Sequence, residues 1–273
     1  MSNRSNIMDN FAPMPIDSIS LAPRARYARV LSIAGSDSGG GAGIQADLKT
    51  MSALGCYGMT AVTALTAQNT QGVRGIHGVP PVFLRQQLDA VLEDIGADAV
   101  KIGMLHAPEI VQEVAGAIDR HALRNVVLDP VMVATSGDRL IAEATVGQLV
   151  RELFPRSTLV TPNLDEAGLL LGRTIAGADE LEGAAQELLA MGAPAVLIKG
   201  GHLPGHEVVD LLALADGNCL RMAAERIATH NGHGTGCTLS SAIAAHLALG
   251  LPLVQAVQQA RAYILGAIAA GAR

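Results

Sequence analysis

The chain has 273 residues, 49% of them hydrophobic but only 2% aromatic, and its formal net charge is −6. That length and apolar content suffice for one sizeable core, built from aliphatic side chains because Trp is absent. The negative charge and the scarcity of aromatic rings argue against a nucleic-acid partner. Three cysteines without a CxxC spacing indicate neither a disulfide framework nor a zinc site, and they favour a reducing compartment.

The first 27 residues carry Pro13, Pro15 and Pro23 among polar residues and lack a continuous apolar run. They predict a flexible lead-in without a signal sequence, followed by a single domain over 28–273. No later stretch gives a convincing membrane span. We therefore expect a soluble, cytoplasmic protein with no membrane partner.

Short runs rich in Val, Ile and Leu alternate with helical patterns, as is typical of βαβ units. The predicted strands are 28–34, 59–66, 97–102, 124–129, 157–161 and 194–199. The predicted helices between them are 81–94, 108–121, 144–153 and 178–191.

Near the end, the turn dipeptide Asp216-Gly217 predicts a hairpin between 207–214 and 218–223. Two further helices are predicted at about 235–249 and 252–270. The whole pattern predicts a mainly parallel central sheet with helices on both faces. In such sheets ligands bind beyond the carboxyl ends of the strands, so the loops that follow the strands are the candidate site.

The segment Gly234-Thr235-Gly236-Cys237 precedes an apolar helical pattern and predicts a glycine-rich turn that opens a helix. Amides at a helix start bind anions, although Gly and Thr also cap helices that bind nothing. A thiol in the first turn has its anion stabilised, so its pKa is expected to fall from about 8.5 toward neutrality. Cys237 is therefore a candidate base, and inert packing is the alternative.

A second glycine-rich segment, GSDSGGGAGIQADLKT, follows the first predicted strand directly. It lacks the Gly-Lys-Ser/Thr of a P-loop, and the next strand lacks the acidic residue of a dinucleotide fingerprint. Its four glycines within five positions indicate a close approach of the backbone to a compact ligand, with Asp37 and Asp47 as polar groups. A flexible tight turn is the alternative.

Asn163 and Glu166 stand where a predicted strand leads into a helix. Their spacing is that of a capping box, and their oxygens are also suitable partners for Mg²⁺ or its waters. Lys199 ends an apolar strand, where a charge is costly unless it meets an anion such as phosphate. Asp129 is an acidic residue in the corresponding position, at the end of the predicted strand 124–129.

His230 and His233 also attract attention, because two histidines three residues apart can bind a metal. They lie in a Gly-Asn loop, however, where solvation is the favoured interpretation.

Several segments together resemble the hydroxymethylpyrimidine and phosphomethylpyrimidine kinases of thiamine biosynthesis, a family with the ribokinase-like fold. The resemblance runs from about Arg29 to Ala269, in order and with ordinary spacings. It implies a ribokinase-like three-layer α/β sandwich, ATP and Mg²⁺ as cofactors, a small pyrimidine substrate and, as in many such kinases, a homodimer. The segments are GSDSGGGAGIQADLKT, ALTAQNT, KIGML, DPVMVATSGD, TPNLDEA, IKGGH and HGTGCT.

The resemblance also implies roles for single residues. Gln68 is similar to the amide with which the family reads the pyrimidine. Cys237 stands where the family has its base, a position that holds Asp in many ribokinase-like sugar kinases. The remaining substrate-pocket residues are Gly35, Asp47, Met104 and Val131.

For the phosphate end, the amides of Gly234, Thr235 and Gly236 are implied to hold the transferring phosphoryl group. Lys199 resembles the phosphate-binding lysine. Asp129 and Thr235 are placed with it on the nucleotide, while Asn163 and Glu166 resemble the group that organises Mg²⁺, through water.

The implied reaction is ATP-dependent phosphorylation of 4-amino-5-hydroxymethyl-2-methylpyrimidine and of its monophosphate. Alternatives are a pyridoxal or pyridoxine kinase of the same superfamily and a non-catalytic ligand-binding relative. The sequence departs from the family pattern at Asn231-Gly232-His233, where Thr is expected before the His, and it stops at Arg273 without the usual GPV-type tail. We expect the anion-binding loop to be intact despite the first departure.

Overall fold

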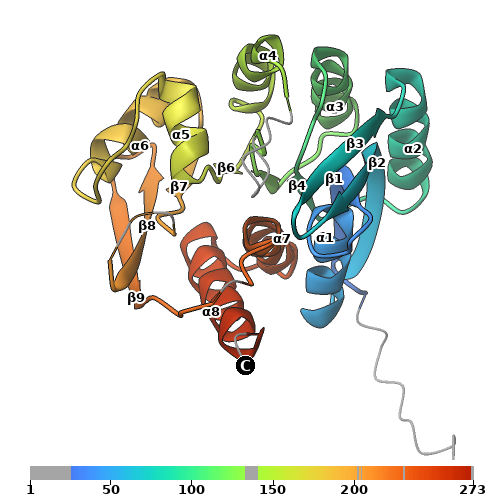
Figure 1. Ribbon diagram of the computed structural model, residues 1–273. Helices are drawn as coiled ribbons and strands as arrows, with labels where there is room; N and C mark the ends of the chain where they lie inside the picture. The colour runs from blue at the N-terminus through green and yellow to red at the C-terminus, as the bar shows by residue number, and fades with distance from the viewer. Residues whose placement is uncertain (1–25, 133–140, 202, 204, 230, 272–273) are drawn as a thin grey trace, which may run out of the picture.

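A computed structural model describes residues 26–132, 141–201, 203, 205–229 and 231–271 (Figure 1). Within these residues a single nine-stranded sheet runs in the order β3-β2-β1-β4-β5-β6-β7-β8-β9. The six strands from β2 to β7 in that order are parallel, and β3, β8 and β9 are antiparallel. The predicted mainly parallel sheet is confirmed.

The strands are β1 (Arg29–Asp37), β2 (Tyr57–Asn69), β3 (Gly72–Gly78), β4 (Ala99–Ile102), β5 (Val126–Leu128), β6 (Leu159–Val160), β7 (Ala195–Ile198), β8 (Glu207–Leu214) and β9 (Cys219–Glu225). The helices are α1 (Gly43–Ala53), α2 (Pro81–Asp94), α3 (Pro108–Arg120), α4 (Glu143–Leu153), α5 (Leu164–Leu171), α6 (Leu181–Ala190), α7 (Thr235–Ala248) and α8 (Leu253–Gly271).

Helices cover both faces of the sheet, so the predicted three-layer sandwich is confirmed (Figure 1). Helices α2 to α6 pack on one face through a cluster of aliphatic side chains that includes Leu84, Ile110 and Leu188. Helices α1, α7 and α8 pack on the other face through a second cluster that includes Met51, Ile243 and Val257. The central strands are therefore buried on both sides, which explains their continuous apolar runs.

The antiparallel hairpin of β8 and β9 is confirmed, with Gly217 at φ +89° in its turn. Two predictions need correction. Strand β1 continues to Asp37, because it bulges after Ala34 and then resumes pairing with β2. Strand β3 and helix α1 were not expected, since GVRGIHG has little apolar content and the glycines around position 40 conceal the helix start.

The lead-in predicted over 1–27 lies almost entirely outside the described residues. No helix in the described part of the chain combines the length and apolarity needed to cross a membrane.

Candidate active site

A cavity of about 520 Å³ lies at the carboxyl ends of the parallel strands, where residues of α7 and α8 also line it. That size is ordinary for a small-molecule site. Every residue expected at the site except Asp47 lines this cavity: Gly35, Gln68, Met104, Asp129, Val131, Asn163, Glu166, Lys199, Gly234, Thr235, Gly236 and Cys237.

The turn before α7 is built around Gly234, which has φ +80° and ψ 4°. A Cβ at this position would collide with the carbonyl oxygen of Gly41, so glycine is required both by the dihedral angle and by the close packing of the two loops. The amide of Thr235 already donates to the carbonyl of Gly232 at 3.3 Å. The amide of Gly236 belongs to the first helical turn, which leaves it without an intrahelical partner.

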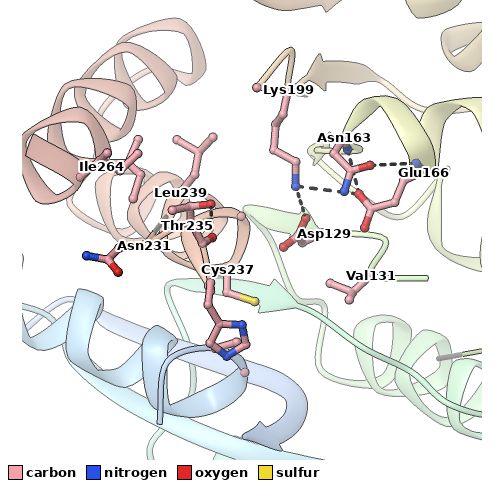
Figure 2. A pocket seen from close by; sticks show the side chains of 18 of the residues that line it. Asp129, Val131, Asn163, Glu166, Lys199, Asn231, Thr235, Cys237, Leu239 and Ile264 are labelled. Carbon is pink, nitrogen blue, oxygen red and sulfur yellow. Dashed lines mark hydrogen bonds and ion pairs between the residues drawn. The ribbon is translucent and has the colours of Figure 1, made fainter. Parts of the chain in front are cut away.

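Cys237 lies in the first turn of α7, partly exposed to the cavity (Figure 2). Burial raises the pKa of its thiol to about 11, against the opposing influence of Lys101. The carboxylates of Asp47 and Asp129 raise it further, while the amide of Gly43 lowers it. The expected fall of the pKa toward neutrality is therefore wrong for the protein without ligands, because burial outweighs the lowering influence of Lys101.

Lys199 follows β7 and reaches across the cavity to two acids (Figure 2). Its Nζ lies 2.7 Å from Asp129 Oδ1 and 3.9 Å from Glu166 Oε2. A Cβ on Gly236 would lie only 3.2 Å from the same Nζ, so the ammonium also adjoins the first turn of α7. Burial opposes ionisation of Asp129, but Lys199 and Lys101 together hold its pKa below the usual value.

Asn163 and Glu166 form the expected capping box at the start of α5. Asn163 Oδ1 accepts from the Glu166 amide at 2.9 Å, and Glu166 Oε2 accepts from the Asn163 amide at 2.8 Å. The Glu166 residue is only 2% exposed, and burial raises the pKa of its carboxyl to about 7. The positive charge of Lys199 lowers this pKa, and the negative charge of Asp129 raises it further.

The glycine-rich loop after β1 is held by Asp37. This carboxylate accepts hydrogen bonds from the amides of Gly39, Gly41 and Ala42. His233 Nε2 lies 2.9 Å from Asp37 Oδ2, which ties this loop to the turn before α7. The segment is therefore an ordered loop, and the expectation that His233 is solvated is wrong because Asp37 binds it. His230 lies outside the described residues.

The expected substrate-pocket residues Gln68, Gly35, Met104 and Val131 all line the cavity. A Cβ on Gly35 would lie 2.7 Å from Met104 Cε, so the missing side chain makes room for the methionine. The single hydroxyl proton of Thr66 is shared between the Ser36 carbonyl at 2.8 Å and Gln68 Oε1 at 3.0 Å, and the second contact helps to orient the carboxamide.

Asp47 does not line the cavity, and the expectation that it contacts the substrate needs correction. It is fully buried, and both its oxygens lie 3.0 Å from Lys101 Nζ. Ser32 and Ser241 also donate to it, each at 2.6 Å. Lys101, which we did not anticipate, lines the cavity in its place. The signal was present in the sequence, since a lysine inside the apolar strand ADAVKI needs a buried partner.

The sequence also gave no indication of the far end of the cavity. Its lining there is largely aliphatic and includes Ile227, Leu239, Ile264 and Ile268. Ile264 and Leu239 come from α8 and α7 and lie beside Thr235 (Figure 2). Periodicity predicted these helices as packed elements, but it cannot tell a side chain that faces a cavity from one that faces the core.

The profile of the family described as "Phosphomethylpyrimidine kinase" matches residues 37–273. The chain belongs to this family. A hydroxymethylpyrimidine/phosphomethylpyrimidine kinase of Rhizobium meliloti (strain 1021) is 55% identical over 249 residues, which cover 90% of this chain and 92% of that protein. The enzyme of the same description from Escherichia coli (strain K12) is 48% identical over 240 residues, covering 88% and 90%.

Solved structures of similar kinases support the same family assignment. The phosphomethylpyrimidine kinase of Clostridium difficile 630 has a TM-score of 0.77 at 42% identity and covers 88% of this chain and 99% of its own. The pyridoxal kinase of Staphylococcus aureus in complex with AMP-PCP and pyridoxal has a TM-score of 0.82 at 34% identity, covering 89% and 88%. The predicted ribokinase-like fold and the predicted class of enzyme, an ATP-dependent small-molecule kinase, are confirmed.

Proposed function

We propose that the protein transfers the γ-phosphoryl group of ATP to the hydroxymethyl group of 4-amino-5-hydroxymethyl-2-methylpyrimidine, and then phosphorylates the monophosphate, in thiamine biosynthesis. The observation that carries this proposal is the convergence of Lys199, the first turn of α7 and the Cys237 thiol on one cavity that also contains Gln68. A ligand-binding relative without catalysis has no use for such phosphate machinery.

Gln68 supports a pyrimidine substrate. An aminopyrimidine presents a ring nitrogen acceptor beside an exocyclic amine donor, and a carboxamide offers the complementary pair. Thr66 uses one lone pair of the Gln68 oxygen, which leaves a second lone pair for the amine. Pyridoxal carries a phenolic oxygen and an aldehyde around its hydroxymethyl group, so it matches this two-point pattern less well.

Phosphoryl transfer depends mainly on alignment and on stabilising charge at the equatorial oxygens. The hydroxymethyl oxygen forms a bond to the γ-phosphorus, the bond from that phosphorus to the β–γ bridging oxygen breaks, and its electron pair stays with ADP. Lys199 and the Gly236 amide neutralise the transferring group. The hydroxyl proton passes to Sγ of Cys237 in its thiolate form, and the resulting thiol later releases the proton to solvent.

The acidic residues at the cavity fit a Mg²⁺ ion. Glu166 is buried and its pKa is raised by burial, so a nearby divalent cation would compensate its ionised form. Asn163 and Glu166 would hold the ion, through water, and the ion would supply neutralisation of phosphate charge. The cap that these residues form for α5 positions their side chains at the cavity.

The decisive experiment measures ATP consumption with four acceptors: hydroxymethylpyrimidine, its monophosphate, pyridoxal and pyridoxine. We expect turnover with both pyrimidines and a kcat/KM for hydroxymethylpyrimidine at least roughly tenfold above that for pyridoxal. Pyridoxal kinase is the second candidate function, because the chain is similar to the Staphylococcus aureus pyridoxal kinase whose structure contains pyridoxal. Equal or reversed preference would establish pyridoxal kinase instead, and no turnover with any acceptor would refute a kinase function.

Three further expectations remain predictions: one domain over 28–273, assembly as a homodimer and residence in the cytoplasm. Size-exclusion chromatography with light scattering tests the second directly.

A further inference from the structure

A fully buried ion pair lies in the wall of the cavity. Lys101 belongs to β4 and has no exposed surface, although the strand around it is aliphatic. Its Nζ lies 3.0 Å from each carboxylate oxygen of Asp47, on α1. Ser32 from β1 and Ser241 from α7 also donate to this carboxylate. Four elements therefore meet at Asp47 and fix the ammonium in place.

This cluster is built into the support of Cys237. Ser241 lies one helical turn after Cys237 on α7, so the hydrogen bond from Ser241 to Asp47 fixes the helix that carries the thiol. Lys101 and Cys237 line the same cavity, whereas Asp47 lies behind its wall. A Cβ on Gly103 would lie 2.9 Å from Lys101 Nζ, so the glycine after β4 leaves room for the ammonium.

The charges around Cys237 act in opposite directions. Lys101 is the strongest influence that lowers the pKa of the thiol, and it exceeds the opposing effect of Asp47. Asp129 adds a second negative charge after β5, and Lys199 interacts with the thiol from the end of β7. At the sulfur of Cys237, the positive charge of Lys101 therefore has a larger influence than the negative charge of its partner Asp47.

We propose that Lys101, clamped by Asp47, is a positioning residue that compensates the negative charge of Cys237 Sγ and so enables Cys237 to accept the proton of the substrate hydroxyl. This inference rests on the role of Cys237 in the proposed function. Burial raises the pKa of this thiol even with Lys101 in place, so without that fixed cation the thiolate would be less accessible still. Lys199 is already engaged by Asp129 and is needed at the phosphates, so it does not replace Lys101.

The test follows the rate of iodoacetamide alkylation of Cys237 against pH without substrates, by mass spectrometry of its peptide. All proteins carry Cys219→Ser, because Cys219 is exposed. The variant Lys101→Met/Asp47→Asn removes both charges at similar volume, which avoids an uncompensated buried ion. We expect its alkylation to slow at least about tenfold at pH 8, because a thiol with a higher pKa has a smaller thiolate fraction at that pH.

Lys49→Met is the matched control, since it removes an exposed lysine from the helix that carries Asp47. Its alkylation profile is expected to match that of the parent. Lys101→Gln/Asp47→Asn is the second neutral variant, to be used if the first does not melt cooperatively, because an amide pair keeps a hydrogen bond between the two positions. An unchanged alkylation rate at pH 8 in a folded neutral variant overturns the proposal.

Kinetics give an independent readout. Loss of a charge that acts through Cys237 lowers kcat at pH 7 with KM changed little, and raising the pH recovers part of kcat as thiolate forms. A purely structural role predicts no such recovery, and that result counts against Lys101. If the parent phosphorylates no acceptor while alkylation is still slower in the neutral variant, the proposed function fails and the electrostatic role of Lys101 stands.

Discussion

The substitution Glu166→Gln distinguishes two roles of Glu166, that of a buried ionisable group and that of a helix cap. Burial raises the pKa of Glu166 from 4.5 to about 7, so the folded protein holds this proton more tightly than the unfolded chain does. The resulting stabilisation is complete below pH 4.5 and is lost as the pH rises through 7. Gln at the same position can still serve the capping box, because its side-chain oxygen accepts from the Asn163 amide as Glu does.

The magnitude follows from the change in pKa. Full ionisation of Glu166 costs roughly 3 kcal/mol of folding free energy, and about 2.5 kcal/mol of this develops between pH 5 and pH 8. Other carboxylates titrate in both proteins, so the difference between wild type and variant isolates Glu166. Relative to wild type, Glu166→Gln should therefore gain about 2.5 kcal/mol when the pH is raised from 5 to 8.

The assay is urea unfolding followed by circular dichroism at pH 5, 6, 7 and 8, without magnesium. Glu182→Gln, on the exposed side of α6, is the matched control and should show the same pH dependence as wild type. A constant difference between wild type and Glu166→Gln across these pH values would refute the reasoning. It would mean that water reaches the carboxylate despite its 2% exposure.

Four further results are expected. Glu166→Gln should raise the Mg²⁺ concentration for half-maximal turnover, and an unchanged titration would leave Glu166 as a cap alone. Cys237→Ala should lower kcat by about two to four orders of magnitude with nucleotide affinity little changed, whereas near-normal kcat would show that the thiol only packs. Gly234→Ala should destabilise the protein by at least about 1 kcal/mol in urea unfolding, because its Cβ meets the Gly41 carbonyl, while Gly232→Ala, with open space around it, should not. Gln68→Leu should erase most of the kcat/KM gap between hydroxymethylpyrimidine and pyridoxal, and a surviving gap would mean that other residues read the ring.

The order of strands and helices was predictable because each element carries its own local signal. Apolar runs that end on a polar residue predicted the parallel strands, and the polar residues Asp129 and Lys199 then fell at the same edge of one sheet. This geometric rule is sufficient to bring together residues 70 positions apart in the sequence, as the 2.7 Å contact of these two side chains shows.

Strand β3 and the start of α1 were not predictable on the same grounds. Strand β3 lies at an edge of the sheet, where half-exposed residues need no apolar pattern. The start of α1 contains Gly43 at φ +56°, and a Cβ there would collide with the carbonyl of Gly35. The glycine that suggested a loop is thus required by tertiary packing, which local sequence does not report.

The same limit explains why the expectations for Asp47 and Cys237 were both wrong. Both follow glycine-rich turns, and from the sequence both seemed available to a ligand. Burial decides differently: Asp47 lies behind the cavity wall, and Cys237 keeps a partial opening but a raised pKa. The raised pKa of the thiol already includes the lowering influence of a cation, without which the thiolate would be less accessible still. That cation, Lys101, is visible in the sequence, but only the meeting of β4 with α1 and α7 shows that Asp47 holds it in the wall of the cavity.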